Sequence, residues 1–461
     1  MKKIKSLLLL MLTMTLIFSQ VPVVSAAEPI DEVRDLIEHY YVEEVPPSIL
    51  SKPSIKEIAD ELDPYSVYMT KKEADRFTNM INQQLTGIGV VLEEHVQGVK
   101  IIQSIPNGPA DQAGLRAGDI ITYVNGKSLS GESVQTAASY ISGEADTSVS
   151  INFLQQETGL TLTKMIIRKK ISLQNVETEW LGGNIGYIRL NSFSMDAAEQ
   201  LQKAIKTMGS AKGFIFDLRN NGGGYVSAAQ EVSGLFPNVE LAFQLRERNQ
   251  EPEVSVALKQ DIQFLKPVHT LVNKNSASAA EMVSASIKEQ NGAVLYGQKT
   301  YGKGSMQSLF ILNDDSMLKL TTAKFYSPKG NEINHIGITP NVVTEIGEEL
   351  AAAHKDHLMK LYSNYKEMPA LSEVPTTKDF TITMNINMNW DTAKTENIQL
   401  IHLGGGEKEF TLQKLDDRKI KVIPKEPLLS KGKYMLIIHP NWKSKNNQTM
   451  KLGNYMEIGV K

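Results

Sequence analysis

The stretch that most constrains the fold runs from Val268 to Gln307. Its apolar beginning, Val268–Val272, predicts a short buried strand. The small polar residues of Asn273–Ser278 predict a turn, and Ala279–Glu289 predicts a helix that an Asn-Gly pair ends. At such a junction, outward backbone N–H groups and the helix dipole favour developing negative charge. Acyl-transfer chemistry requires its nucleophile and oxyanion donors in a place of this kind.

Ser278, the last residue of the turn, is the candidate nucleophile, and Lys303 is the candidate base. Glycines flank Lys303 on both sides and allow the backbone to bend closely around a buried site. A lysine accepts a proton only when it is neutral, which burial away from water favours. Gln307 falls on the same face as Lys303 in a helix or a strand, so its amide carbonyl could orient the lysine.

A structural interpretation of the same residues stays open. Ser278 and Glu281 have the spacing of a capping box, in which the serine only caps the helix. A Gly-Lys-Gly run is also common in exposed loops.

This stretch resembles the catalytic core of the C-terminal processing peptidases, also called tail-specific proteases. That family has a Ser-Ala-Ser-Ala-Ser-Glu run with the nucleophile at its second serine. A lysine in Gly-Lys-Gly follows after 25 positions and a glutamine after four more, as here (303 − 278 and 307 − 303). The resemblance implies that Ser278 is the nucleophile, Lys303 the base and Gln307 the orienting residue. Ala280, where the family usually has serine, is a departure without an evident catalytic consequence.

Composition narrows the class of protein. A chain of 461 residues with 41% hydrophobic and 22% charged residues predicts an ordinary globular protein of about three domains. The net charge of −3 gives no reason to expect a nucleic-acid partner. The absence of cysteine excludes disulfides, thiol catalysis and cysteine metal sites. The eight histidines form no His-Glu-x-x-His pair, so we expect neither metal nor cofactor.

Residues 1–26 are predicted to be a signal peptide. Three lysines precede the apolar run Leu7–Phe18, which is too short to span a bilayer. Val24–Ala26 offers a small-residue cleavage site. We therefore expect export to the extracellular space or to the outer side of the cytoplasmic membrane, with an uncleaved anchor as the alternative.

Residues 27–83 are predicted to form an N-terminal helical region. Its segment Leu62–Met69 also resembles the N-terminal region of the peptidase family. Whether this region packs within one chain or supports a homo-oligomer stays open.

Residues 84–170 resemble a PDZ domain. The loop Gly87-Ile88-Gly89-Val90 is followed, in register, by Ala-Gly-Leu, Ala-Gly-Asp and Val-Asn-Gly. PDZ domains add an extended peptide to a sheet edge. The resemblance implies that the loop holds the C-terminal carboxylate of a protein or peptide substrate.

Residues 171–368 are predicted to form the protease core, an α/β layer with a mainly parallel sheet. A glycine run, Gly222–Gly224, follows the buried strand Gly213–Leu218. The family has proline where this chain has Gly222, and it implies that Gly224 and Ala279 donate the oxyanion N–H groups. A structural tight turn is the alternative. A polar helix is predicted over 348–368, and its His354 and His357 are assigned to solvent without a role.

Residues 369–461 contain short alternating runs and resemble bacterial immunoglobulin-like modules, so we predict an all-β sandwich. It could dock to the cell wall, to a protein partner or to a second subunit.

The sequence thus predicts a secreted serine endopeptidase with a Ser-Lys dyad, whose PDZ domain recognises substrate C-termini or gates the site. The alternative is a catalytically inactive PDZ-containing scaffold at the cell surface. A chymotrypsin-like or α/β-hydrolase serine enzyme is disfavoured, because Gly-Asp-Ser-Gly-Gly and Gly-x-Ser-x-Gly are both absent.

Overall fold

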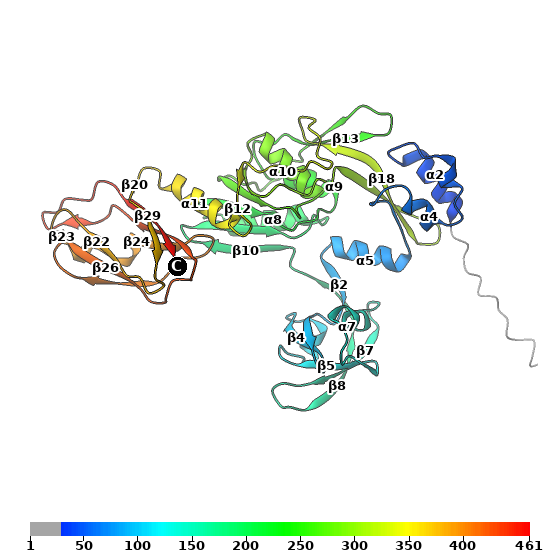
Figure 1. Cartoon of the computed structure of the whole chain (residues 1–461), viewed down its shortest axis with the longest axis horizontal. Coiled ribbons are helices and arrows are strands. Elements are labelled where there is room, and N and C mark those ends of the chain that lie inside the picture. The colour runs from blue at the N-terminus through cyan, green and yellow to red at the C-terminus, as the bar shows by residue number, and fades with distance from the viewer. Residues whose placement is uncertain (1–28) are drawn as a thin grey trace, which may run out of the picture. The chain divides into compact units, whose positions relative to one another are not determined.

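The computed structural model describes residues 29–461 (Figure 1). The predicted signal peptide lies outside the described residues. Within them, no helix combines the length and apolar character needed to cross a membrane. The chain forms two compact units. Among the described residues, the first comprises 29–74 together with Gln307–Thr322, and the second comprises Asp75–Met306 together with Ala323–Lys461.

The first unit packs short helices on part of two long strands. The helices are α2 (Ile30–Tyr40), α3 (Pro47–Leu50) and α4 (Ile55–Asp60). The buried residues of these helices form one core with a segment of the later chain. The helices contribute Val33, Ile37, Ile55 and Ile58, and the later segment contributes Leu312, Leu318 and Leu320. Strand β1 (Val67–Met69) pairs antiparallel with the start of β18 (Met317–Tyr326), Val67 opposite Lys319. The prediction of a helical region over 27–83 did not include β1, whose partner lies too far along the chain for local periodicity to reveal it.

The predicted PDZ domain belongs to the second unit and follows α5 (Lys71–Ile81) in the chain. Its sheet has the order β3-β4-β5-β7-β8, with β6 paired to β5. Strands β7 (Ser148–Leu154) and β8 (Thr161–Ile167) form a hairpin and pair from Ser148 opposite Ile167. The other elements are β2 (Gln84–Gly87), β3 (Val90–His95), β4 (Gly98–Ser104), α6 (Pro109–Gln112), β5 (Ile120–Val124), β6 (Lys127–Ser128), α7 (Val134–Ile141) and β9 (Lys169–Ser172), of which β2 and β9 pair and close the domain.

The predicted protease core has a six-stranded sheet of order β10-β11-β12-β15-β16-β19. It is parallel from β11 onward, as predicted, and only β10 runs antiparallel. Helices α8, α9 and α10 cover one face, and α11 packs on the other (Figure 1). The bounds are β10 (Val176–Leu181), β11 (Ile185–Leu190), α8 (Ala197–Thr207), β12 (Gly213–Asp217), α9 (Val226–Ser233), β15 (Val268–Val272), α10 (Ala279–Glu289), β16 (Val294–Gly297), β19 (Val342–Val343) and α11 (Glu349–Leu361), while β13 (Leu241–Glu247) pairs with β14 (Glu253–Val256) and the end of β18.

Helix α11 corrects the assignment of two histidines to solvent. His354 and His357 are 0% and 4% exposed. His357 Nε2 bonds the Phe214 carbonyl oxygen at 2.8 Å, and His354 Nε2 bonds that of Gly182 at 2.8 Å. The helix is buried on two sides, because its other face packs on the C-terminal domain through Leu358. Histidines can occupy such a position because their ring nitrogens satisfy backbone groups there.

The C-terminal domain is built of strands, as the all-β prediction requires. One sheet has the order β20-β29-β27-β24, with β21 also on β29, and another has the order β22-β26-β25. Both sheets contribute to one core, which includes Phe380, Leu400, Val422, Leu436 and Trp442. The immunoglobulin-like assignment stays a prediction. The bounds are β20 (Lys366–Glu367), β21 (Leu371–Val374), β22 (Phe380–Thr383), β23 (Met388–Asn389), β24 (Ile398–His402), β25 (Phe410–Lys414), β26 (Lys419–Pro424), β27 (Lys433–Ile438), β28 (Lys443–Ser444) and β29 (Asn454–Val460).

The buried histidines of α11 should make stability depend on pH. Burial lowers the pKa of His357 to about 3, with a smaller contribution from nearby His269, and lowers that of His354 to about 4. An unfolded histidine titrates near ~6.5. Between that value and the folded pKa the unfolded chain binds more protons, so the free energy of unfolding should fall as the pH is lowered. For each histidine the slope approaches about 1.4 kcal/mol per pH unit.

Urea unfolding measured at several pH values between 7 and 5 checks this expectation. The variant His357→Gln keeps a donor for the Phe214 carbonyl but cannot titrate, so its pH slope should be smaller than that of the natural protein. An unchanged slope would show that His357 does not contribute to the pH dependence.

Candidate active site

Ser278 occupies a strained turn between β15 and α10. Its backbone has φ 57° and ψ −117°, a region that residues other than glycine rarely adopt. The surrounding hydrogen bonds hold the turn in place. Ser276 Oγ donates to the Leu218 carbonyl at 2.8 Å, and the Ala277 N–H donates to that of Asn221 at 2.9 Å. The predicted strand, turn and helix are therefore present, and they fix the backbone of the candidate nucleophile.

The buried carboxylate of Glu281 links the backbones of Ser278 and Lys303. Its Oε2 accepts from both N–H groups at 2.9 Å. Its Oε1 accepts from the Thr300 hydroxyl and from the Gly302 N–H, each at 2.6 Å. Glu281 is 0% exposed, and this burial raises the pKa of the carboxyl although its four donors favour the charged form. The bond to Ser278 is one half of the predicted capping box, but the same carboxylate also anchors the Lys303 loop.

The two glycines beside Lys303 are required by close backbone contacts. A Cβ on Gly304 would lie 2.5 Å from the Asn334 nitrogen. Gly302 has φ 89°, and its carbonyl accepts from the His335 N–H at 2.8 Å. The loop is thus held against residues 333–337, and it leaves Lys303 half-buried immediately before β17 (Ser305–Ile311).

The glycine run after β12 lies against Ser278. A Cβ on Gly223 would be 2.8 Å from Ser278 Cβ and 3.0 Å from the Ala279 nitrogen. The Asn221 side chain shapes the run, because its Oδ1 accepts from the Gly223 N–H and its Nδ2 donates to the Leu190 carbonyl, both at 2.8 Å. Sequence reasoning named Gly224 here and missed the contact that Gly223 makes with Ser278.

Gly224 forms a parallel bridge with Phe193 through the backbones of its two neighbours. The Phe193 N–H donates to the Gly223 carbonyl at 3.0 Å, and the Tyr225 N–H donates to the Phe193 carbonyl at 2.8 Å. In this arrangement the N–H of Gly224 itself points away from Phe193. Among the hydrogen bonds found in residues 29–461, neither the Gly224 N–H nor the Ala279 N–H is a donor. Both predicted oxyanion donors therefore keep their hydrogen-bonding capacity in the described structure.

Sequence reasoning missed an ion-pair group that lies next to the glycine run. Arg219 donates to both Asp217 oxygens and to Glu349 Oε2 at 2.9 Å. Asp217 is fully buried and also accepts from the Tyr187 hydroxyl at 2.7 Å. The signal was an Asp and an Arg two positions apart at the end of an apolar strand, but their partner on α11 could not be read from spacing.

Gln307 lies in the first unit and is half-buried. Its amide nitrogen donates to the Thr321 hydroxyl at 3.2 Å. The orientation of the amide is therefore tied to a residue of β18.

The PDZ loop Gly87–Val90 leads into β3, an edge strand of the domain's sheet. The loop is shaped by two bonds, from the Ala110 N–H to the Ile88 carbonyl at 2.8 Å and from the Ile105 N–H to the Gly89 carbonyl at 2.9 Å. Gly89 has φ 78°, which favours glycine. An edge strand of this kind can pair with an added peptide.

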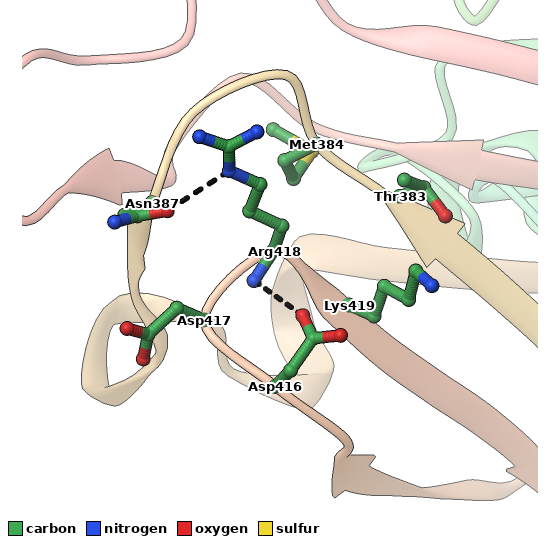
Figure 2. Close-up of a pocket in the computed structure, with 7 residues that line it drawn as sticks. All are labelled: Thr383, Met384, Asn387, Asp416, Asp417, Arg418 and Lys419. Atoms are coloured by element: carbon green, nitrogen blue, oxygen red, sulfur yellow. Dashed lines mark hydrogen bonds between the residues drawn. The ribbon is translucent and has the colours of Figure 1, made fainter.

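In the part of the chain that the structure describes, no group of three or more histidines and carboxylates could hold an ion. Figure 2 shows a pocket in the C-terminal domain, where Arg418 bonds Asn387 at 2.9 Å through its side chain and Asp416 at 2.7 Å through its backbone. This pocket contains none of the predicted site residues.

The chain is similar to known peptidases. Residues 184–344 match the model of peptidase family S41, and residues 100–154 match that of a PDZ domain. The chain is 34% identical over 326 residues to the carboxy-terminal processing protease CtpA of Bacillus subtilis, covering 70% of each chain. It is 31% identical to CtpB of the same organism over 324 residues, covering 69% of this chain and 67% of that one. A photosystem II D1 C-terminal processing protease aligns at a TM-score of 0.45 with 23% identity, covering 72% of this chain and 95% of that one.

The fold and the matches define a serine peptidase that carries a PDZ domain. The chain belongs to the carboxy-terminal processing proteases of peptidase family S41. The family resemblance seen in the sequence is thereby confirmed, and a PDZ-containing peptidase implies protein or peptide substrates.

Replacing Glu281 tests the link between the two loops. In Glu281→Gln an NH₂ group must face two of the four donors, which leaves them without an acceptor. We expect the variant to lose about 2–4 kcal/mol of unfolding free energy, and its kcat should fall at least tenfold. The matched control is Glu199→Gln, an exposed glutamate in the first turn of α8, which should change neither quantity. Natural activity in Glu281→Gln would show that the shared carboxylate does not set the site geometry.

Proposed function

We propose that this protein cleaves peptide bonds with a Ser278-Lys303 dyad oriented by Gln307. The observation that carries the proposal is the common anchor at Glu281, which binds the backbone N–H of both dyad residues at 2.9 Å. If Glu281 only completed the cap of α10, its carboxylate would not also accept a hydrogen bond from a loop more than twenty positions away in the sequence.

The reaction begins when neutral Lys303 takes the proton of the Ser278 hydroxyl as Oγ attacks the substrate carbonyl carbon. Negative charge develops on the carbonyl oxygen and is stabilised by the N–H groups of Gly224 and Ala279. The lysine then gives its proton to the leaving amine as the peptide bond breaks, which produces an acyl-enzyme. A water molecule repeats the attack with Lys303 as base, releasing the new carboxyl terminus and restoring the serine.

Three features support these roles. The strained backbone at Ser278 places the hydroxyl at the start of α10, where the helix dipole favours an oxyanion. The N–H groups of Gly224 and Ala279 make no hydrogen bond within the described residues. Gln307 lies four positions after Lys303 in the sequence, and its amide carbonyl is an acceptor of the kind that a lysine donor requires.

The PDZ domain is proposed to hold a substrate's C-terminal carboxylate at Gly87–Val90 and to pair its last residues with β3. The support is the edge position of β3 and the glycine loop that opens it. We also propose that the protein is exported, on the basis of the N-terminal segment alone.

Ser278→Ala and Lys303→Ala should each abolish cleavage of an unfolded protein substrate while leaving the far-UV circular dichroism unchanged. The double variant should be no worse than either single one, because the two residues act as a unit. Ser227→Ala, an exposed serine on α9, serves as the control and should retain activity. Cleavage by Ser278→Ala at a substantial rate would contradict the assignment, and inactivity of the natural protein would favour the binding scaffold.

The PDZ proposal is tested with two peptides that differ only at the C-terminus. Backbone N–H groups of the loop can form charge-assisted hydrogen bonds to a free acid that an amide cannot reproduce. The full-length Ser278→Ala protein should therefore bind an apolar-ended acid at least tenfold more tightly than its amide, a difference of about 1.4 kcal/mol by calorimetric titration. Equal affinities would mean that the PDZ domain does not recognise a carboxylate through this loop.

A further inference from the structure

A buried polar network surrounds Asp63 in the first unit. Asp63 Oδ1 accepts from the backbone N–H groups of Tyr65 and Ser66 at 2.7 and 3.0 Å, and Oδ2 accepts from the Ser66 hydroxyl at 2.6 Å. This is a local turn in which an aspartate binds its own following backbone. Because Oδ1 already receives two backbone donors, it acts only as an acceptor.

Thr321 of β18 joins this network to Gln307. Its hydroxyl donates to Asp63 Oδ1 at 3.1 Å, and its N–H donates to Ser66 Oγ at 3.1 Å. Thr321 and Ser66 are only 3% and 4% exposed, so water cannot easily replace these bonds. The Thr321 hydroxyl has a single hydrogen, which is given to Asp63, and it can therefore only accept from a further partner.

That further partner is the Gln307 amide, whose Nε2 donates to Thr321 Oγ1 at 3.2 Å. The two ends of a glutamine amide have nearly the same shape, and only the hydrogen-bond network decides which end faces which way. Here Asp63 accepts the hydrogen of the Thr321 hydroxyl, so the Thr321 oxygen must accept from the amide. Only the NH₂ end of the amide can donate to it. The NH₂ end is committed to Thr321, and the carbonyl oxygen is the opposite end.

We propose that Asp63 and Thr321 are positioning residues that fix the direction of the Gln307 carboxamide, with its NH₂ end on Thr321 and its carbonyl oxygen at the opposite end, the direction that the proposed orientation of Lys303 requires. A reversed amide would present hydrogen-bond donors to a lysine that itself only donates, and the orientation would be lost. The inference rests on the proposed role of Gln307. It also gives a function to the segment Leu62–Met69, which the sequence resemblance left without one.

A purely structural role predicts a different outcome, since the same bonds also tie the Asp63 turn to β18. The two roles can be separated with matched variants of the full-length protein. Thr321→Val keeps the shape of the side chain but loses both hydrogen-bonding functions, whereas Thr321→Ser keeps the hydroxyl. The control is Thr322→Val, the next residue of β18, whose hydroxyl bonds Ser308 at 2.7 Å and is also buried.

We expect Thr321→Val to lower kcat for a peptide substrate on the order of tenfold, the loss of one orienting hydrogen bond, with KM unchanged. Thr321→Ser should retain most of the activity, and Thr322→Val should match the natural protein. Thermal melting establishes that each variant is folded. If Thr321→Val does not fold, Thr321→Ala takes its place in the same comparison.

The decisive step repeats Thr321→Val in a Gln307→Ala background. If Thr321 acts through Gln307, the second substitution should cause no further loss of kcat. Equal losses in both backgrounds would overturn the inference, as would full activity of Thr321→Val when Gln307→Ala is impaired. Full activity of Gln307→Ala itself would instead refute the role of Gln307 in the proposed function, and the inference with it.

Discussion

The site depends on one buried carboxylate. Glu281 is fully enclosed and accepts four hydrogen bonds, two of them from the backbones of Ser278 and Lys303. Burying a charge is costly unless donors surround it, so this group is stable only when the turn and the glycine loop are both in place. The same condition that stabilises the carboxylate therefore sets the positions of two loops that are distant in sequence.

Packed layers of secondary structure support the site. Helix α11 is packed between the protease sheet and a sheet of the C-terminal domain. Its first residue, Glu349, binds Arg219 beside the glycine run, and Glu348, immediately before the helix, pairs with Lys433 of β27. The C-terminal domain is thus in physical contact with the helix whose first residue binds Arg219. We expect the packing of α11 to be sensitive to acid, because burial lowers the pKa of its histidines His354 and His357.

Much of the fold and of the candidate site could be predicted from the sequence, because these features depend on the spacing of residues that are close together in the chain. The strand, turn and helix around Ser278, the parallel sheet and the PDZ elements all follow from short patterns. What could not be predicted depends on contacts between distant segments. Glu281 looked like half of a helix cap because its bond to Lys303 lies outside the cap. The histidines of α11 looked solvated because their carbonyl partners come from other elements, and β1 had no visible partner before β18 was placed.

The central claim is that Lys303 activates Ser278, and active-site labelling measures this most directly. A fluorophosphonate reacts only with an activated serine, and mass spectrometry of the digested protein identifies the labelled residue. The account predicts that the label is found on Ser278 in the natural protein and is absent from folded Lys303→Ala. Labelling of another serine, or of Ser278 at the natural rate in Lys303→Ala, would contradict it.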